Sequence, residues 1–185
     1  MNSATKFFVR AKHWQVFAVL LGAMCVADVI AQWWSLPGQG PWSATFVPLF
    51  LSSTLLGVSY ALWTWSLGIF LNSAVRPDLR LGTKLLRIAA VFPAVYLPLF
   101  DVFLSNVRPV LFLLNLPLQA FATFCLFYSL YFISKSLVLA EKETTIEFPN
   151  YIGTLFLIWC FPIGVWFTQP RINRLYAASL NEKIA

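Results

Sequence analysis

The stretch TFVPLFLSSTLLGVSYALWTWSLGIFL, residues Thr45 to Leu71, decides the fold. It runs for twenty-seven residues without a charged side chain. A helix of about twenty apolar residues is already long enough to cross the hydrocarbon core of a bilayer. Four further segments are apolar over most of their length, and they cover Gln15–Trp34, Ile88–Asn106, Val110–Ser134 and Tyr151–Thr168. The sequence therefore predicts an all-α fold, a polytopic bundle of transmembrane helices.

The composition leaves little sequence outside these segments. Of the 185 residues, 59% are hydrophobic and 11% are charged, while soluble domains carry about a quarter charged residues. The connections are too short to form a separate domain, so we expect residues 1–185 to form one integral membrane domain with the lipid bilayer as its partner. The net charge of +6 comes from residues that flank the apolar segments. This distribution is typical of membrane proteins and argues against nucleic acid as a partner.

Basic residues predict how the chain is threaded, because Lys and Arg accumulate in short cytoplasmic loops. The N-terminal tail and the 72–87 connection are rich in these residues, the 34–45 connection has none, and the 106–109 turn has only Arg108. This alternation predicts four confident spans and a multi-pass protein with a cytoplasmic N-terminus.

The fifth segment has two interpretations. Its apolar part, residues 153–167, would measure about 22 Å as a straight helix, less than the roughly 30 Å of the hydrocarbon core. Pro162 and Gly164 interrupt it and mark a helix break. A span would place Arg171 outside, whereas a re-entrant hairpin would return it to the cytoplasm. Because a re-entrant tip must bury its backbone in protein, we favour a span and keep the hairpin as the alternative.

Small residues recur at intervals of four on the first two segments. The stripes consist of Ala23, Ala27 and Ala31 on the first segment and of Ser53, Gly57 and Ala61 on the second. Such stripes let helix backbones approach closely, which drives helix association in lipid. We expect the first two helices to pack against each other through these faces. The alternative is the seam of a homo-oligomer.

Two carboxylates lie inside the apolar segments, Asp28 and Asp101, and both are expected in the outer half of the membrane. An intramembrane acid is costly unless it faces the bundle interior or water. We therefore predict a polar intramembrane cluster, and its members are Asp28, Asp101, Asn115, Gln32 and Gln119. The functional interpretation is an ion, proton or ligand site; the alternative is that each acid is hydrogen-bonded locally.

The sequence offers no catalytic or metal-binding pattern. His13 is the only histidine, and Cys25, Cys125 and Cys160 lie apart in apolar segments without CxxC spacing. We therefore expect no metal, no cofactor and no enzyme activity. A membrane-embedded binding or accessory protein, acting with another membrane protein, is the favoured hypothesis. The alternative is a small proton- or cation-coupled transporter or channel-like protein that uses Asp28 and Asp101.

Both ends of the chain resemble a known type of protein. AKHWQ at residues 11–15 and YIGTLFLIWCFPIGVWFTQPRIN at residues 151–173 are similar to small bacterial polytopic membrane proteins of the Bacteroidota type, whose C-terminal segment reads like FPIGxWFxQPRIN. The resemblance implies a bacterial inner membrane and carries no activity. Within it, residues 169–173 resemble a structural corner, with a polar exit, a helix stop and an arginine available to lipid headgroups.

Overall fold

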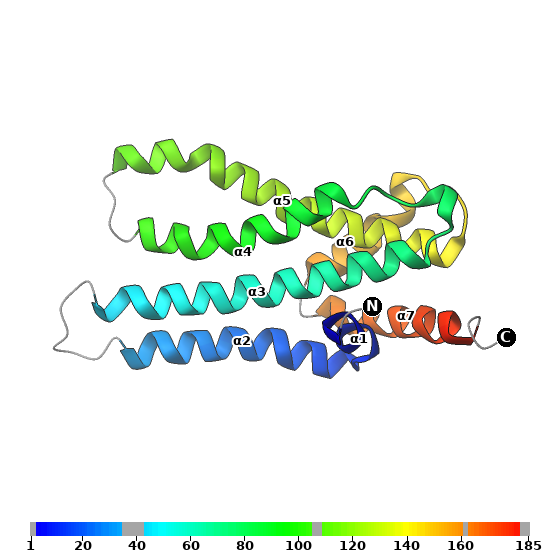
Figure 1. Cartoon of the computed structure of the whole chain (residues 1–185), viewed down its shortest axis with the longest axis horizontal. Helices are drawn as coiled ribbons and strands as arrows, with labels where there is room; N and C mark the ends of the chain where they lie inside the picture. The colour runs from blue at the N-terminus through cyan, green and yellow to red at the C-terminus, as the bar shows by residue number, and fades with distance from the viewer. Residues whose placement is uncertain (1–2, 35–42, 105–108, 161–162, 182–185) are drawn as a thin grey trace.

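The computed structural model of the chain describes residues 3–34, 43–104, 109–160 and 163–181, with the side chains of most of them. Within these ranges the protein is all-α, as expected, and contains no strand. Its elements are α1 (Ser3–Arg10), α2 (His13–Trp34), α3 (Ser43–Ala74), the 3-10 helix η1 (Pro77–Leu79), α4 (Lys84–Leu104), α5 (Pro109–Lys142), α6 (Phe148–Trp159) and α7 (Ile163–Asn181) (Figure 1).

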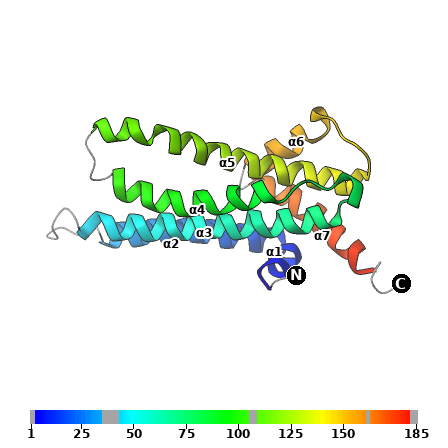
Figure 2. The ribbon, with the colours of Figure 1, turned by 45° about the horizontal axis from the view of Figure 1, so that its top comes forward.

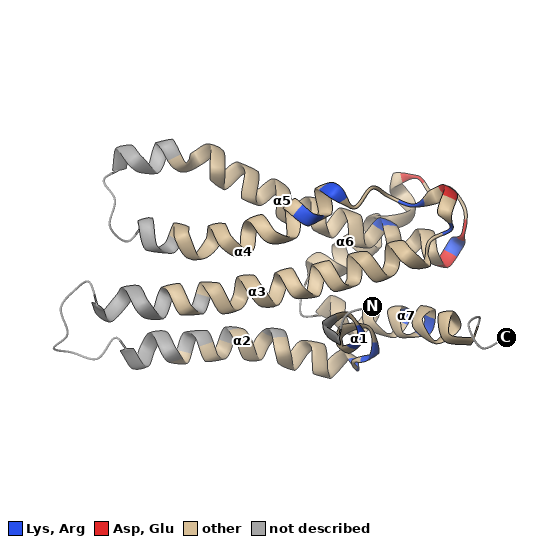
Figure 3. Cartoon of the chain, in the orientation of Figure 1, with Lys and Arg blue, Asp and Glu red and all other residues tan. Residues whose placement is uncertain are grey.

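The long helices α2, α3, α4 and α5 run along the length of the molecule (Figure 1). Helix α3 packs against α2 and α4, and α4 packs against α5. Helix α5 also contacts α3, so the four helices form a bundle and not a flat row (Figure 2). The described charged residues gather towards the end that carries α1, η1 and the α5–α6 connection (Figure 3). We call this the charged end.

The helices extend beyond the apolar segments at the charged end. Helix α3 continues to Ala74, α4 begins at Lys84, and α5 continues to Lys142. Helix α5 stops where Glu143 adopts a φ of 52°, the left-handed conformation that commonly ends a helix. The α3–α4 connection is held by Asn72, whose Oδ1 accepts a hydrogen bond from Leu81 N at 2.9 Å and whose Nδ2 donates to Leu81 O at 3.0 Å.

The bundle is apolar outside and partly polar inside. Exposed large hydrophobic side chains cover every long helix, and they include Val26, Val29, Leu55, Val58, Leu62, Val91, Val95, Leu99, Leu118, Phe124 and Phe127. Fully buried polar side chains lie between the helices, and they include Thr64, Ser66, Ser129, Ser134 and Ser136. Soluble proteins distribute these residue types the other way round and rarely expose such large apolar patches.

Two described helical stretches are long and apolar enough to cross a membrane, judged by length and composition, and they are Ser53–Ala74 and Asn115–Lys142. In their most apolar windows only 44% and 28% of the residues are buried inside the protein. The core helix of a soluble protein would be mostly buried. Many apolar side chains of these stretches, including Leu62, Phe124 and Phe127, therefore face outward.

The fifth apolar segment is not one straight helix. Helix α6 ends at Trp159, and α7 begins at Ile163 and returns towards the charged end (Figure 1). Arg171 Nη1 donates a hydrogen bond to Thr154 Oγ1 at 3.1 Å, although the two residues are 17 positions apart. Along a straight helix that separation would be about 25 Å. The expectation of a single span over residues 151–168 was wrong, and this segment is a helical hairpin.

Gly164 allows the two helices of the hairpin to meet. A Cβ atom at this position would lie 1.4 Å from Leu157 O and 2.3 Å from Leu157 C. The backbones of α6 and α7 are thus in direct contact where the chain reverses. Only glycine, which has no Cβ, fits between them.

At least part of the small-residue stripe of α3 faces α4 and not α2. A Cβ on Gly57 would meet Ala94 Cα of α4 at 3.0 Å, and one on Gly68 would meet Leu86 Cδ2 of α4 at 2.5 Å. Positions eleven residues apart share one face of a helix, so this face of α3 belongs to α4. Helices α2 and α3 do pack together, and Ala23 is buried. The expectation that Gly57 lies in the α2–α3 contact was wrong.

Candidate functional site

The described part of the expected polar cluster lies between α4 and α5. Tyr96 Oη donates a hydrogen bond to Gln119 Oε1 at 3.1 Å, and the side chain of Asn115 also interacts with Tyr96. The side chains of Asp28, Gln32 and Asp101 fall outside the described residues, as do those of Ala27 and Ala31. The acid pair therefore stays a prediction, and Tyr96 joins Asn115 and Gln119 in the cluster.

Three buried hydroxyls of α3 and α5 donate to carbonyls of their own helices. Thr64 donates to Tyr60 O at 2.8 Å, Ser129 to Cys125 O at 2.9 Å and Ser134 to Leu130 O at 2.6 Å. Bonds of this kind to the preceding turn satisfy a hydroxyl inside an apolar bundle. No group of three or more His, Cys, Asp or Glu that could hold a metal ion occurs among the described residues.

The most elaborate polar arrangement lies at the charged end, where α7 meets α1. Gln169 is 1% exposed, and its Nε2 lies 2.8 Å from Phe8 O, 3.1 Å from Ala11 O and 3.2 Å from Asn173 Oδ1. Asn173 Nδ2 donates a second bond to Ala11 O at 3.3 Å. The last carbonyls of a helix have no partner within it. Two side chains of α7 thus cap the C-terminal end of α1.

This capping corrects the expected corner at residues 169–173. Helix α7 continues through Pro170 to Asn181, so the segment contains no helix stop. Gln169 is not a polar exit, because it is buried and bound to the end of α1. The same contact sets how α1 lies against the bundle.

Arg171 is half-buried and is bound to two other helices. Its Nε donates to Glu141 Oε1 at 2.7 Å, and its Nη2 donates to Glu141 Oε2. With the bond to Thr154, this side chain joins the end of α5, the middle of α6 and the middle of α7. The expectation that Arg171 is available to lipid headgroups was wrong, because the carboxylate of Glu141 already binds its guanidinium in a bidentate manner.

A ring contact joins the hairpin to the start of α2. The rings of His13 and Trp166 lie with centroids 4.3 Å apart at 44°. This ring contact and the hydrogen bonds of Gln169 and Arg171 hold α7 against α1, α2, α5 and α6. We call this set of contacts, made by Trp166, Gln169, Arg171 and Asn173, the α7 junction.

Sequence reasoning missed the partners in the α7 junction. Glu141 carried one available signal, because the hairpin alternative would return Arg171 to the side of the membrane where Glu141 is expected. Gln169 carried none, since nothing in the sequence relates it to Phe8. The junction holds helices together, and its described side chains provide no nucleophile beside a base.

Comparisons of the chain with models of protein families, with curated proteins and with solved structures find no match.

Proposed function

We propose that the protein is an integral membrane protein in which α2, α3, α4 and α5 cross the bilayer and the α6–α7 hairpin enters it without crossing. The apolar exterior of the long helices around a partly polar interior carries this proposal. Lipid solvates such an exterior without cost, whereas water would be in contact with large apolar patches. The length and composition of residues 53–74 and 115–142 support it.

The tip of the hairpin supports a re-entrant segment. Its described exposed side chains include five large apolar ones, and they are Phe156, Trp159, Ile163, Trp166 and Phe167. Backbone groups beside the turn are paired, since Cys160 N donates to Phe156 O and Gly164 N donates to Cys160 O. Both features suit a helical turn within hydrocarbon, where unpaired backbone groups are costly.

The charged end is the cytoplasmic side in this proposal, because Lys and Arg concentrate there. The N-terminus and the end of α7 then share the cytoplasmic face, because α7 returns to that end. The resemblance to small bacterial polytopic proteins adds the bacterial inner membrane as the location.

Within the membrane we propose a binding or accessory role. The polar side chains with specific geometry hold helices to one another, as Gln169, Arg171 and Asn72 do. What the bundle offers to other molecules is its apolar exterior, which suits a helix of another membrane protein or of a second copy.

A photo-crosslinking residue tests this role in the native membrane. On the proposal, probes at neighbouring exposed positions of one helix crosslink to the same protein partner, while probes on the other long helices react with lipid. Suitable exposed pairs, one on each long helix, are Val26 and Val29, Val58 and Leu62, Val91 and Val95, and Phe124 and Phe127. Phe124 is 51% exposed, and its neighbour Cys125 is 0% exposed and provides the matched buried control. Lipid adducts alone from every exposed position would refute the accessory role.

A further inference from the structure

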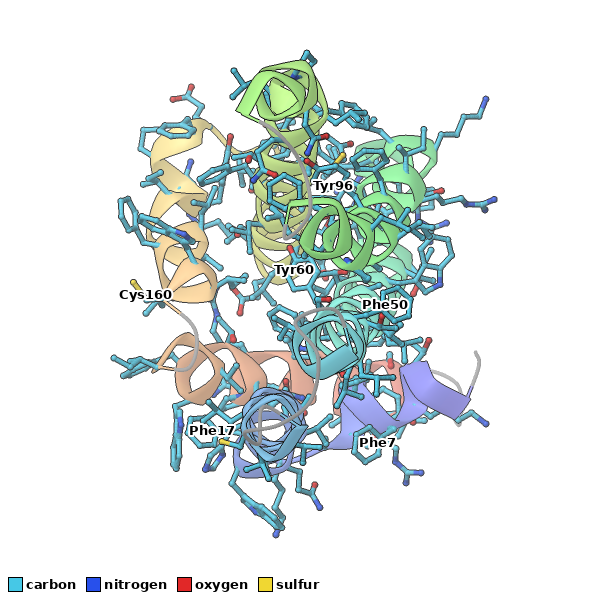
Figure 4. All side chains as sticks on the ribbon, turned by 90° about the vertical axis from the view of Figure 1, so that its left-hand side faces the viewer. Phe7, Phe17, Phe50, Tyr60, Tyr96 and Cys160 are labelled. Atoms are coloured by element: carbon cyan, nitrogen blue, oxygen red, sulfur yellow. The ribbon has the colours of Figure 1, made fainter. Side chains whose placement is uncertain are left out.

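Helix α1 lies across the charged end of the bundle. In Figure 1 it is seen nearly end-on beside the long helices, and in Figure 4, viewed along the bundle, it is seen from the side. It packs against α3 and α7. In the proposed orientation, a helix placed across the bundle at this end lies in the plane of the cytoplasmic headgroups.

The two faces of α1 differ in character. Thr5, Phe8 and Val9 are buried against the bundle. Lys6, Phe7 and Arg10 are exposed, and Phe7 alone has 47% of its surface exposed. Positions 6 and 10 are one helical turn apart with residue 7 beside them. The outward face therefore presents a phenylalanine flanked by two cations.

The next residues continue this pattern. Lys12 is exposed, and Trp14 at the start of α2 is 53% exposed. We call Lys6, Phe7, Arg10, Lys12 and Trp14 the α1 face. Aromatic rings and basic side chains side by side are typical of segments that lie in the membrane interface, with rings among the acyl chains and cations at the phosphates.

The cations of the α1 face have no acidic partner in the described residues. The described ion pairs are Arg76–Asp78 and Arg171–Glu141. The remaining described acids, Glu143 and Glu147, lie in the α5–α6 connection, away from α1 (Figure 3). The charge on this face is therefore complementary to an acidic surface.

The face is held in a fixed position. Gln169 and Asn173 cap the end of α1, and the Arg10 guanidinium carbon lies 6.0 Å from the centre of the Tyr176 ring. A charge held in place loses less side-chain freedom on binding than a charge on a free tail. The backbone of α1 and the Arg10 side chain are therefore preorganised for a ligand.

We propose that the α1 face is a binding site for acidic phospholipid, in which Lys6, Arg10 and Lys12 contact the anionic headgroup and Phe7 and Trp14 enter the acyl boundary. The proposal rests on the membrane location proposed above. The site selects phosphatidylglycerol-type lipids over zwitterionic ones through charge, since basic residues at an acidic membrane surface contribute about fivefold each to affinity.

Lipid retention measured by native mass spectrometry tests the proposal. The full chain is purified in a mild detergent and given equal amounts of phosphatidylglycerol and phosphatidylcholine of the same acyl chains. The wild type is expected to retain phosphatidylglycerol preferentially, and the Lys6→Gln/Arg10→Gln variant to lose that preference by about 25-fold, which is fivefold for each cation removed. Lys84→Gln, which removes an exposed cation at the start of α4, is the matched control and is expected to keep the preference.

Three results would overturn the site. They are equal retention of both lipids by the wild type, an unchanged preference in the double variant, and an equal loss in Lys84→Gln. If the double variant does not fold, the wild type at 0.5 M NaCl serves instead, because the preference must fall as salt screens the charges. Inorganic phosphate at millimolar concentration must not remove the preference, since the proposed ligand is a lipid. A protein that stays soluble without detergent would instead refute the membrane location, so the two failures are distinct.

Discussion

Replacing Gly164 with alanine is expected to disrupt the α6–α7 hairpin. The new methyl carbon would lie 1.4 Å from Leu157 O, far inside van der Waals contact, and the obstacle is backbone that no change of rotamer can move. The two helices must separate, and the α7 junction loses its geometry with them. We expect the free energy of unfolding in mixed micelles to fall by about 3 kcal/mol or more.

Gly153→Ala is the matched control for this substitution. Gly153 lies in α6 of the same hairpin, and a Cβ there would meet nothing within 4 Å. Alanine also favours helix over glycine by about 1 kcal/mol, so this variant should be as stable as the wild type or slightly more stable. Equal stability of the Gly164 and Gly153 variants would contradict the close crossing of α6 and α7.

Gln169→Met is expected to have the second large effect. Methionine keeps the length of the side chain and removes the amide donor, so Phe8 O loses its partner in a buried position and Ala11 O keeps only Asn173. A buried polar group left without a partner costs about 1–3 kcal/mol. We expect the free energy of unfolding to fall by about 2–3 kcal/mol and α1 to detach from α7, measured as faster hydrogen exchange in residues 8–11.

The same substitution at Gln119 provides the graded comparison. Gln119 accepts one hydrogen bond, from Tyr96, in a partly buried position. Its replacement by methionine should cost about 1 kcal/mol and leave hydrogen exchange in α1 unchanged. If the two variants lose equal stability, or if α1 exchange does not respond to Gln169→Met, the capping role of Gln169 is wrong.

The sequence predicted the all-α fold because apolar length alone decides it. Residues 45–71 are uncharged over a distance that a helix covers in one piece, and α3 extends from Ser43 to Ala74. The polar turns that lengthen α4 and α5 at the charged end were not predicted. Hydropathy locates the apolar part of a helix and not its ends, since a helix continues into polar sequence that favours it.

The direction of the fifth segment and the face of Gly57 could not be predicted, because both depend on tertiary contacts. The length of the fifth segment and Pro162 were compatible with a span and with a hairpin. The contact that excludes a straight helix joins Arg171 to Thr154. A glycine allows any neighbouring helix to approach closely, and in the structure the backbone of Ala94 in α4 lies against Gly57.

The expected polar cluster as a whole stays a prediction, although two of its residues share a neighbour. Asn115 and Gln119 both meet Tyr96. Tyr96 was not among the residues expected in the cluster. The roles of Asp28 and Asp101 stay predictions, since their side chains lie outside the described residues.

Accessibility of residue 179 tests the re-entrant topology most directly. A Ser179→Cys variant is made in a chain whose native cysteines, Cys25, Cys125 and Cys160, are replaced, and intact cells are treated with a membrane-impermeant thiol reagent. Gly38→Cys, in the 34–45 connection expected outside, is the positive control. Residue 38 is expected to be labelled in intact cells, and residue 179 only after the membrane is permeabilised. Labelling of residue 179 in intact cells would contradict it, because α7 would then end outside.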